Sequence, residues 1–178
     1  MNRRRLAFRI TRGLFLTDTR MSGWGRAWQL LSRFTWELPQ TLVGWLYSMG
    51  RAVLGRIDRV DTFGGITFVT RSNCGYGMGV SLGSFIDLWT WRDTGLRDED
   101  FVVGDQLCMH EYGHVVDSRR FGFLYLFVIG IPSLMSAYGK GDHRVFWTEL
   151  RANHHAKRYF AKFPKVRWDD REYPSQKR

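Results

Sequence analysis

Two histidines stand four residues apart near the middle of the chain, at His110 and His114, with Glu111 directly after the first. The segment has no proline and follows Asp105, a suitable N-cap, so a helix over 105–121 is expected. On a helix the two imidazoles differ by about 40° around the axis and about 6 Å along it. Both then project from one face. The pattern predicts two nitrogen ligands for one metal ion and a neighbouring carboxylate that accepts a proton from water.

A catalytic zinc site needs a third protein ligand, and Glu149 is the best candidate. It lies in a second expected helix, over 144–163, which Pro164 ends. Asn153 follows one turn later on the same face, where an amide can hydrogen-bond the outer nitrogen of a zinc histidine. The sequence therefore predicts that two helices hold one Zn²⁺ between them.

Other residues compete for places in this site. Asp117 lies on nearly the same helix face as the two histidines, and either ligates the ion or accepts a hydrogen bond from a ligand. His143 or Tyr138 is a candidate to polarise a substrate carbonyl and stabilise its oxyanion. His154 and His155 are expected to point away from the face that carries the third ligand.

The HEYGH motif at 110–114 and the later ELRAN segment at 149–153 resemble the gluzincin branch of the zincin metallopeptidases. In that branch an HExxH helix pairs with a downstream ExxxD helix, and Asn153 stands here in place of the aspartate. The resemblance implies a zinc metallopeptidase that acts on a peptide or protein. It also implies roles for four residues: the metal ligands His110, His114 and Glu149, and the general base Glu111.

Further motifs look like those of an uncharacterised group of small bacterial HEYGH proteins, a likeness that covers most of residues 34–160 and brings no known substrate. These motifs are WELPQ at 36–40, SLGSFI at 81–86, GIPSL at 130–134 and WTE at 147–149. The HEYGH segment also looks like that of intramembrane site-2 proteases. The charged residues of 92–105 and the lack of a later Leu-Asp-Gly motif favour a helix outside the membrane.

Length and charge bound the organisation of the chain. Its 178 residues suit one domain, and two cysteines, Cys74 and Cys108, cannot form a disulfide framework. Residues 1–60 hold eleven arginines and three acids, and so carry +8 of the net charge of +10. This basic arm contains expected amphipathic helices over 26–36 and 40–54, which either cap the core or dock on an anionic membrane.

The remaining segments predict a small sheet and irregular connections. Residues 65–71 and 76–86 read as a β-hairpin, and 92–100 as a loop. The uncharged stretch 121–138 is interrupted by glycine, serine and proline, which favours a buried or interfacial segment over a membrane span. The polar tail, 165–178, is expected to fray.

The sequence thus predicts an α+β, zincin-like domain over 61–164, preceded by the arm at 1–60 and followed by the tail at 165–178. The apolar run at the N-terminus is too short for a cleavable secretion signal, so a cytoplasmic protein, peripheral to the inner membrane where its arm docks, is expected. The alternative is a non-catalytic, metal-containing module whose basic arm binds membrane or, less favoured, nucleic acid. No nucleic-acid recognition motif is present.

Overall fold

The computed structural model describes residues 2–176, which form seven α-helices and one four-stranded sheet. The expected α+β class is confirmed. The helices are α1 (Arg3–Gly13), α2 (Gly23–Phe34), α3 (Leu38–Val53), α4 (Asp98–Gly104), α5 (Gln106–Phe121), α6 (Ile131–Ala137) and α7 (Trp147–Phe160). Short 3₁₀ segments η1 (Gly122–Leu124) and η3 (His143–Val145) and a π-helical turn η2 (Leu126–Gly130) complete the helical part.

The sheet has the strand order β1-β2-β4-β3, which makes β3 an edge strand. Its members are β1 (Arg59–Phe63), β2 (Ile66–Arg71), β3 (Met78–Leu82) and β4 (Phe85–Trp89). β1 pairs antiparallel with β2, β2 parallel with β4, and β4 antiparallel with β3. The expected hairpin of 65–71 with 76–86 is therefore wrong.

A turn at Gly83 and Ser84 explains the error, because it divides the second expected strand into β3 and the start of β4. Gly83 has φ +62°, and a Cβ there would overlap the backbone of Thr41, so only glycine fits this turn. Strand β1, which was not expected, forms the other true hairpin with β2. The sheet therefore contains two hairpins, β1 with β2 and β3 with β4, in place of the one expected hairpin of 65–71 with 76–86.

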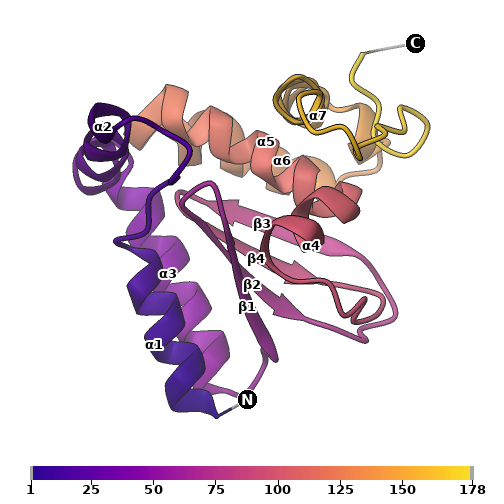
Figure 1. Cartoon of the computed structure of the whole chain (residues 1–178). Helices are drawn as coiled ribbons and strands as arrows, with labels where there is room; N and C mark the ends of the chain where they lie inside the picture. Colours follow the sequence, from indigo (N-terminus) through magenta and orange to yellow (C-terminus); the bar gives the residue numbers. More distant parts are fainter. Residues whose placement is uncertain (1, 177–178) are drawn as a thin grey trace.

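Helices cover both faces of the sheet (Figure 1). On one face α1 and α3 pack together against a cluster that includes Ile10, Val69 and Phe85. On the other, α4, α5 and α7 enclose a larger cluster built around Phe68 and Tyr112. The first sixty residues therefore supply part of the core rather than a detached arm. Helix α1 was not expected, whereas α2 and α3 lie close to the expected ranges 26–36 and 40–54.

Of the segments around the predicted site, α5 and α7 agree with the ranges predicted from the sequence, whereas α4 does not. Helix α5 begins after Asp105, whose Oδ1 accepts a hydrogen bond from the Leu107 amide (2.9 Å), and ends at Gly122 with φ +53°. Helix α7 falls within the expected 144–163. Part of the expected loop over 92–100 is helical instead, as the start of α4.

The tail also differs from expectation, because residues 165–176 pack back onto the domain. Trp168 packs against the larger core cluster, and Gln106 Nε2 donates to the carbonyl oxygen of Asp169 (2.9 Å). The expected fraying is wrong for this part of the tail. Residues 177 and 178 lie outside the described residues.

The uncharged stretch 121–138 forms a bent series of helical turns from η1 to α6. Only Gly122, Tyr125 and Ile129 are buried, so most of its apolar side chains reach the surface. Within residues 2–176 no single helix combines the length and the apolar character needed to cross a bilayer. One pair, Gln106–Leu124 with Leu126–Ala137, meets these criteria only jointly and is bent by 120°.

Helices α5 and α7 make the closest helix packing that bears on the predicted site. A Cβ on Gly113 would overlap the backbone carbonyl of Ala152, so a glycine in the HEYGH motif lets the two helix backbones touch. Ala152 is itself fully buried in this contact. The spacing between the two helices therefore depends on the absence of a single side chain.

We expect Gly113→Ala to lower the free energy of unfolding by about 1–3 kcal/mol, because the added methyl group forces the helices apart. The same shift should weaken metal binding. Urea unfolding of the metal-free protein measures the first effect, and zinc titration measures the second. Gly50→Ala is the matched control, since nothing lies within 4 Å of a Cβ at that helical position. An unchanged unfolding free energy for Gly113→Ala would contradict the packing argument.

Candidate metal centre

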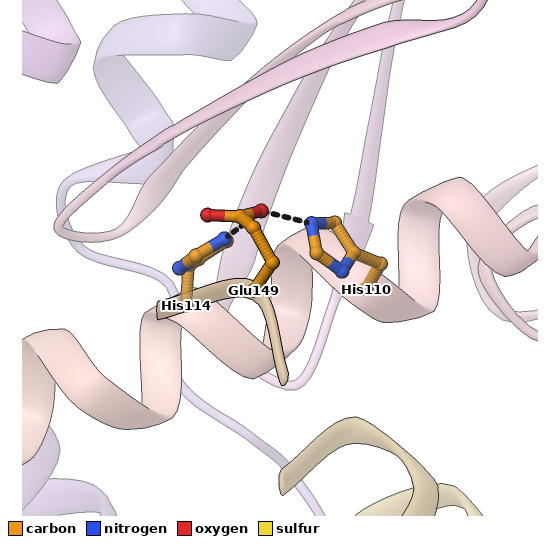
Figure 2. A group of neighbouring side chains, drawn as sticks. All are labelled: His110, His114 and Glu149. Carbon is orange, nitrogen blue, oxygen red and sulfur yellow. Dashed lines mark hydrogen bonds and ion pairs between the residues drawn. The ribbon is translucent and has the colours of Figure 1, made fainter. Parts of the chain in front are cut away.

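Three buried side chains from α5 and α7 converge on one point (Figure 2). His110 Nε2 lies 3.2 Å and His114 Nε2 3.3 Å from the same carboxylate oxygen, Glu149 Oε2. The candidate ligand atoms all lie within 4.8 Å of one another, so this group could hold a metal ion. The structure thus brings together the three residues that the sequence predicted as ligands.

Helix geometry explains the pairing of the histidines. His110 and His114 are one turn apart on α5, and their rings meet edge to face with centroids 5.0 Å apart. Glu149 enters from the first turn of α7, which crosses α5 at the Gly113 contact. All three residues are at most 7% exposed.

Asn153 orients His110, as its position one turn after Glu149 predicted. Its Oδ1 lies 2.6 Å from His110 Nδ1, and its Nδ2 donates to the carbonyl oxygen of Pro174 (2.8 Å). With its amide fixed in this way, Asn153 presents an oxygen that can accept the Nδ1 proton of His110, which frees Nε2 to ligate a metal ion. That tautomer is the one a metal ligand requires.

The carboxylate of Glu149 is fixed from its other side. Its Oε1 accepts hydrogen bonds from Ser133 Oγ (2.7 Å) and Thr148 Oγ1 (2.8 Å). Oε2 is thereby left to face the two imidazoles. Because one oxygen is hydrogen-bonded and the other faces the imidazoles, the carboxylate is suited to bind a metal ion through Oε2 alone.

The electrostatics of the centre favour a positive charge at its middle. Burial opposes a charged His114, yet the charge and hydrogen bond of Glu149, with help from Glu111, raise the His114 pKa to about 9. Burial likewise opposes ionisation of Glu149, but the two histidines hold its pKa far below the ordinary value. A divalent cation would supply the positive charge that protonated histidine provides otherwise.

Glu111 stands beside the centre without belonging to the ligand group. It is buried, and its Oε2 accepts a hydrogen bond from Ser81 Oγ on edge strand β3 (2.7 Å). A Cβ on Gly79 would overlap the Glu111 carboxylate, so a glycine in β3 leaves the space that this side chain fills. The sequence prediction placed Glu111 next to the histidines but did not foresee the contact with β3.

Asp117 belongs to neither the ligand group nor the hydrogen-bond partners of its histidines among the described residues, contrary to both predicted alternatives. Its Oδ1 lies 2.6 Å from Arg151 Nε and 3.2 Å from His155 Nε2, both on the outer part of α7. This ion pair turns Asp117 toward the α5–α7 interface beyond the centre. Its contact is therefore with α7 rather than with a ligand histidine.

His143 and Tyr138, the two candidates for polarising a substrate carbonyl, differ in their distance from the centre. His143 Nε2 lies 3.6 Å from Glu149 Oε2, while its Nδ1 contacts Ser136 Oγ (3.1 Å) and its side chain is partly exposed. Tyr138 is 87% exposed, and its backbone amide closes the last turn of α6 by donating to the carbonyl oxygen of Leu134 (3.3 Å). Of the two, only His143 lies at the centre, and the prediction for Tyr138 fails because α6 ends with that ring pointing outward.

Sequence reasoning missed three contributors to the centre. Ser133 and Ser81 fall within the quoted motifs GIPSL and SLGSFI, which signalled their segments but not their roles. Tyr173, in the tail that was expected to fray, places its ring 5.3 Å from that of His110. No pattern in the sequence linked this tail to a helix sixty residues earlier.

Comparisons with protein-family models, with curated proteins and with solved structures give no match to this chain. The gluzincin resemblance thus remains a prediction that rests on the motifs. The argument for a metal centre rests on geometry: two oriented imidazoles and one anchored carboxylate oxygen fit a divalent cation that accepts nitrogen and oxygen ligands.

We expect His110→Ala to abolish stoichiometric zinc binding, because it removes one of three ligands. Asn153→Ala should retain binding but lower the affinity by about 10–100-fold, since the imidazole loses its orienting partner. Competition with a chromophoric chelator measures both. His154→Ala, an exposed histidine on α7 outside the ligand group, is the control and should bind like the wild type. Equal affinity in all four proteins would contradict the assigned centre.

Proposed function

We propose that the chain is a zinc-dependent peptidase in which Glu111 is the general base. The observation that carries the proposal is the position of Glu111: a buried carboxylate, adjacent in sequence to one ligand, is held apart from the ligand group by Ser81. A carboxylate placed beside a metal centre but not within it is the arrangement that metal-assisted hydrolysis requires.

The ligand set favours zinc among the divalent ions. Two imidazoles and one carboxylate form a three-ligand set typical of catalytic zinc, which keeps a further position for water or substrate. Oxygen-rich sites suit calcium or magnesium, and this group contains only one oxygen donor. When bound, zinc acts as a Lewis acid that polarises a carbonyl and lowers the pKa of water.

The chain itself then moves the proton. Glu111 would accept a proton from the attacking water and donate it to the leaving amine as the peptide bond breaks. Ser81 Oγ, which hydrogen-bonds Glu111 Oε2, would hold the carboxylate in one orientation through both transfers. His143, whose side chain lies partly exposed beside Glu149, would donate a hydrogen bond to the oxygen of the attacked carbonyl.

Edge strand β3 offers a place for the substrate backbone. The tight turn makes Leu82 and Phe85 a hydrogen-bonded pair, so by alternation the backbone groups of Gly79 and Ser81 face away from β4. Tyr125 Oη already donates to the carbonyl oxygen of Ser81 (2.9 Å). An extended peptide would therefore add to β3 at Gly79, directly beside Glu111.

Glu111→Gln should keep stoichiometric zinc and lose at least about 100-fold in kcat, because the amide cannot accept the proton. Cleavage of a fluorogenic peptide library, with zinc content determined on the same samples, tests this expectation. Glu99→Gln is the control, since that carboxylate is well exposed on α4. Full activity in zinc-loaded Glu111→Gln would refute the assignment of the base.

His143→Ala should lower kcat by about 100-fold with little change in KM or zinc content, because one donor to the developing oxyanion is lost. Steady-state kinetics on a peptide that the wild type cleaves separates the two constants. His154→Ala should match the wild type. A change confined to KM would assign His143 to substrate binding instead.

A further inference from the structure

Helices α2 and α3 carry their polar and apolar residues on the opposite sides from those of an ordinary surface helix. In α3 the buried residues include four polar side chains: Gln40, Thr41, Ser48 and Arg51. Its exposed residues include Leu42, Val43, Leu46, Tyr47 and Val53, spaced so that they form one continuous stripe. A helix in water is expected to show the reverse arrangement.

Helix α2 repeats this inverted pattern. It buries Gln29, Ser32 and Arg33 and exposes Trp24, Trp28, Leu31 and Phe34. Helix α6 adds Ile131, Leu134 and Met135, and none of its seven residues is buried. We call these exposed side chains of α2, α3 and α6, together with those of η1 and η2, the apolar face.

The buried polar groups have specific partners, which indicates that the inversion is built into the fold. Arg33 donates to the carbonyl oxygens of Leu14, Leu16 and Gly65 at 2.7–2.8 Å. Arg51 Nη1 pairs with Asp87 Oδ1 (2.6 Å), and Ser48 donates to the other oxygen of that carboxylate. Rotating either helix to bury its apolar stripe would break these bonds, so the stripes remain outside.

The parts of the apolar face adjoin one another. Trp36, between α2 and α3, packs edge to face on Phe123 of η1 with ring centroids 5.3 Å apart. Its Nε1 donates to the carbonyl oxygen of Arg119 near the end of α5 (3.2 Å), and α2 lies at this end of α5 (Figure 1). A hollow of about 510 Å³ between α2 and η1 is lined by Trp28 and Leu31 together with Phe123.

The residues around the apolar face carry positive charge, which favours an anionic partner. Residues 22–57 and 121–141 contain one carboxylate, Glu37, which is buried and bonded to Ser32 and Ser118. Six exposed arginines lie on α2, after α3, and on α1, which packs against α3. Within residues 2–176 none of these six pairs with a carboxylate: Arg3, Arg4, Arg5, Arg12, Arg26 and Arg56.

We propose that the apolar face docks into the surface of an anionic lipid bilayer. Tryptophan, leucine and phenylalanine would enter the boundary between headgroups and acyl chains, and the arginines would contact anionic headgroups. A protein partner would need a carboxylate-rich rim of matching shape, whereas a bilayer supplies apolar depth and negative charge over the whole area. The bilayer is therefore the occupant that these observations favour.

Docking would place the metal centre beside the membrane. Helix α6 exposes Leu134 and Met135 on one side, while Ser133 and Ser136 on its other side contact Glu149 and His143. One short helix thus joins the apolar face to a predicted ligand. Lipid binding itself requires neither metal nor hydrolysis, so it can be tested apart from the proposed function.

Flotation of the full chain with vesicles tests the proposal, using phosphatidylcholine with about 30% phosphatidylglycerol and phosphatidylcholine alone. The wild type should float with the anionic vesicles, and less with neutral ones. Trp28→Glu and Met135→Glu should each lower partitioning by about tenfold, since a charge replaces an inserted side chain. Trp91→Glu is the matched control, because Trp91 and Trp28 are both 68% exposed and Trp91 lies outside the apolar face.

Three results would overturn the proposal: no flotation of the wild type, equal flotation of all variants, or a stable dimer that only Trp28→Glu and Met135→Glu dissociate. The last result would show that a second copy of the chain covers the face. The two variants lie on different helices, so a folding defect in one, detected by circular dichroism, leaves the other as the test.

Discussion

The contact between Gly113 and the Ala152 carbonyl sets the distance between α5 and α7, and the candidate centre depends on that distance. Two histidines one turn apart on a helix point toward the same side, but a metal site with three protein ligands also needs a ligand from another element. Because the helix backbones touch, the short reach of a glutamate suffices to bring Glu149 Oε2 within 3.3 Å of both imidazoles. Asn153, one turn further along the same helix, meets His110 for the same reason.

Sequence reasoning succeeded where the information is local. Helix α5 carries its own N-cap and stop, and the four-residue spacing of His110 and His114 determines their common face. Glu149 and Asn153 were predicted together because one helix turn separates them, so the pairing of their helix with the HEYGH helix brings both to the centre. The ends of a helix and the residues that share one of its faces follow from spacing along the chain, so the sequence alone predicts them.

Apart from the pairing of α5 with α7, the long-range contacts could not be predicted from the sequence. The strand prediction failed because residues 76–86 were interpreted as one strand, whereas Gly83, with its positive φ, forms a turn within them. Neither Ser133 nor Tyr173 shows any local sign of its place at the centre, since each reaches it only after the chain has folded back. Asp117 shows the opposite error: its helix face was nearly right, but Arg151 and His155 attract its carboxylate elsewhere.

The polar interior beneath α2 and α3 and the apolar exterior above them are two aspects of one constraint. Burial of Arg33 and Arg51 is tolerated only because carbonyl oxygens and Asp87 satisfy them, and their bonds fix the rotation of each helix. Once those rotations are fixed, the remaining apolar side chains have no interior left to fill. These side chains stay on the surface beside exposed arginines, and Glu37, the one carboxylate of residues 22–57 and 121–141, is buried, so the proposed partner is apolar and anionic. The fold thus leads from buried guanidinium groups to the expectation of a lipid surface.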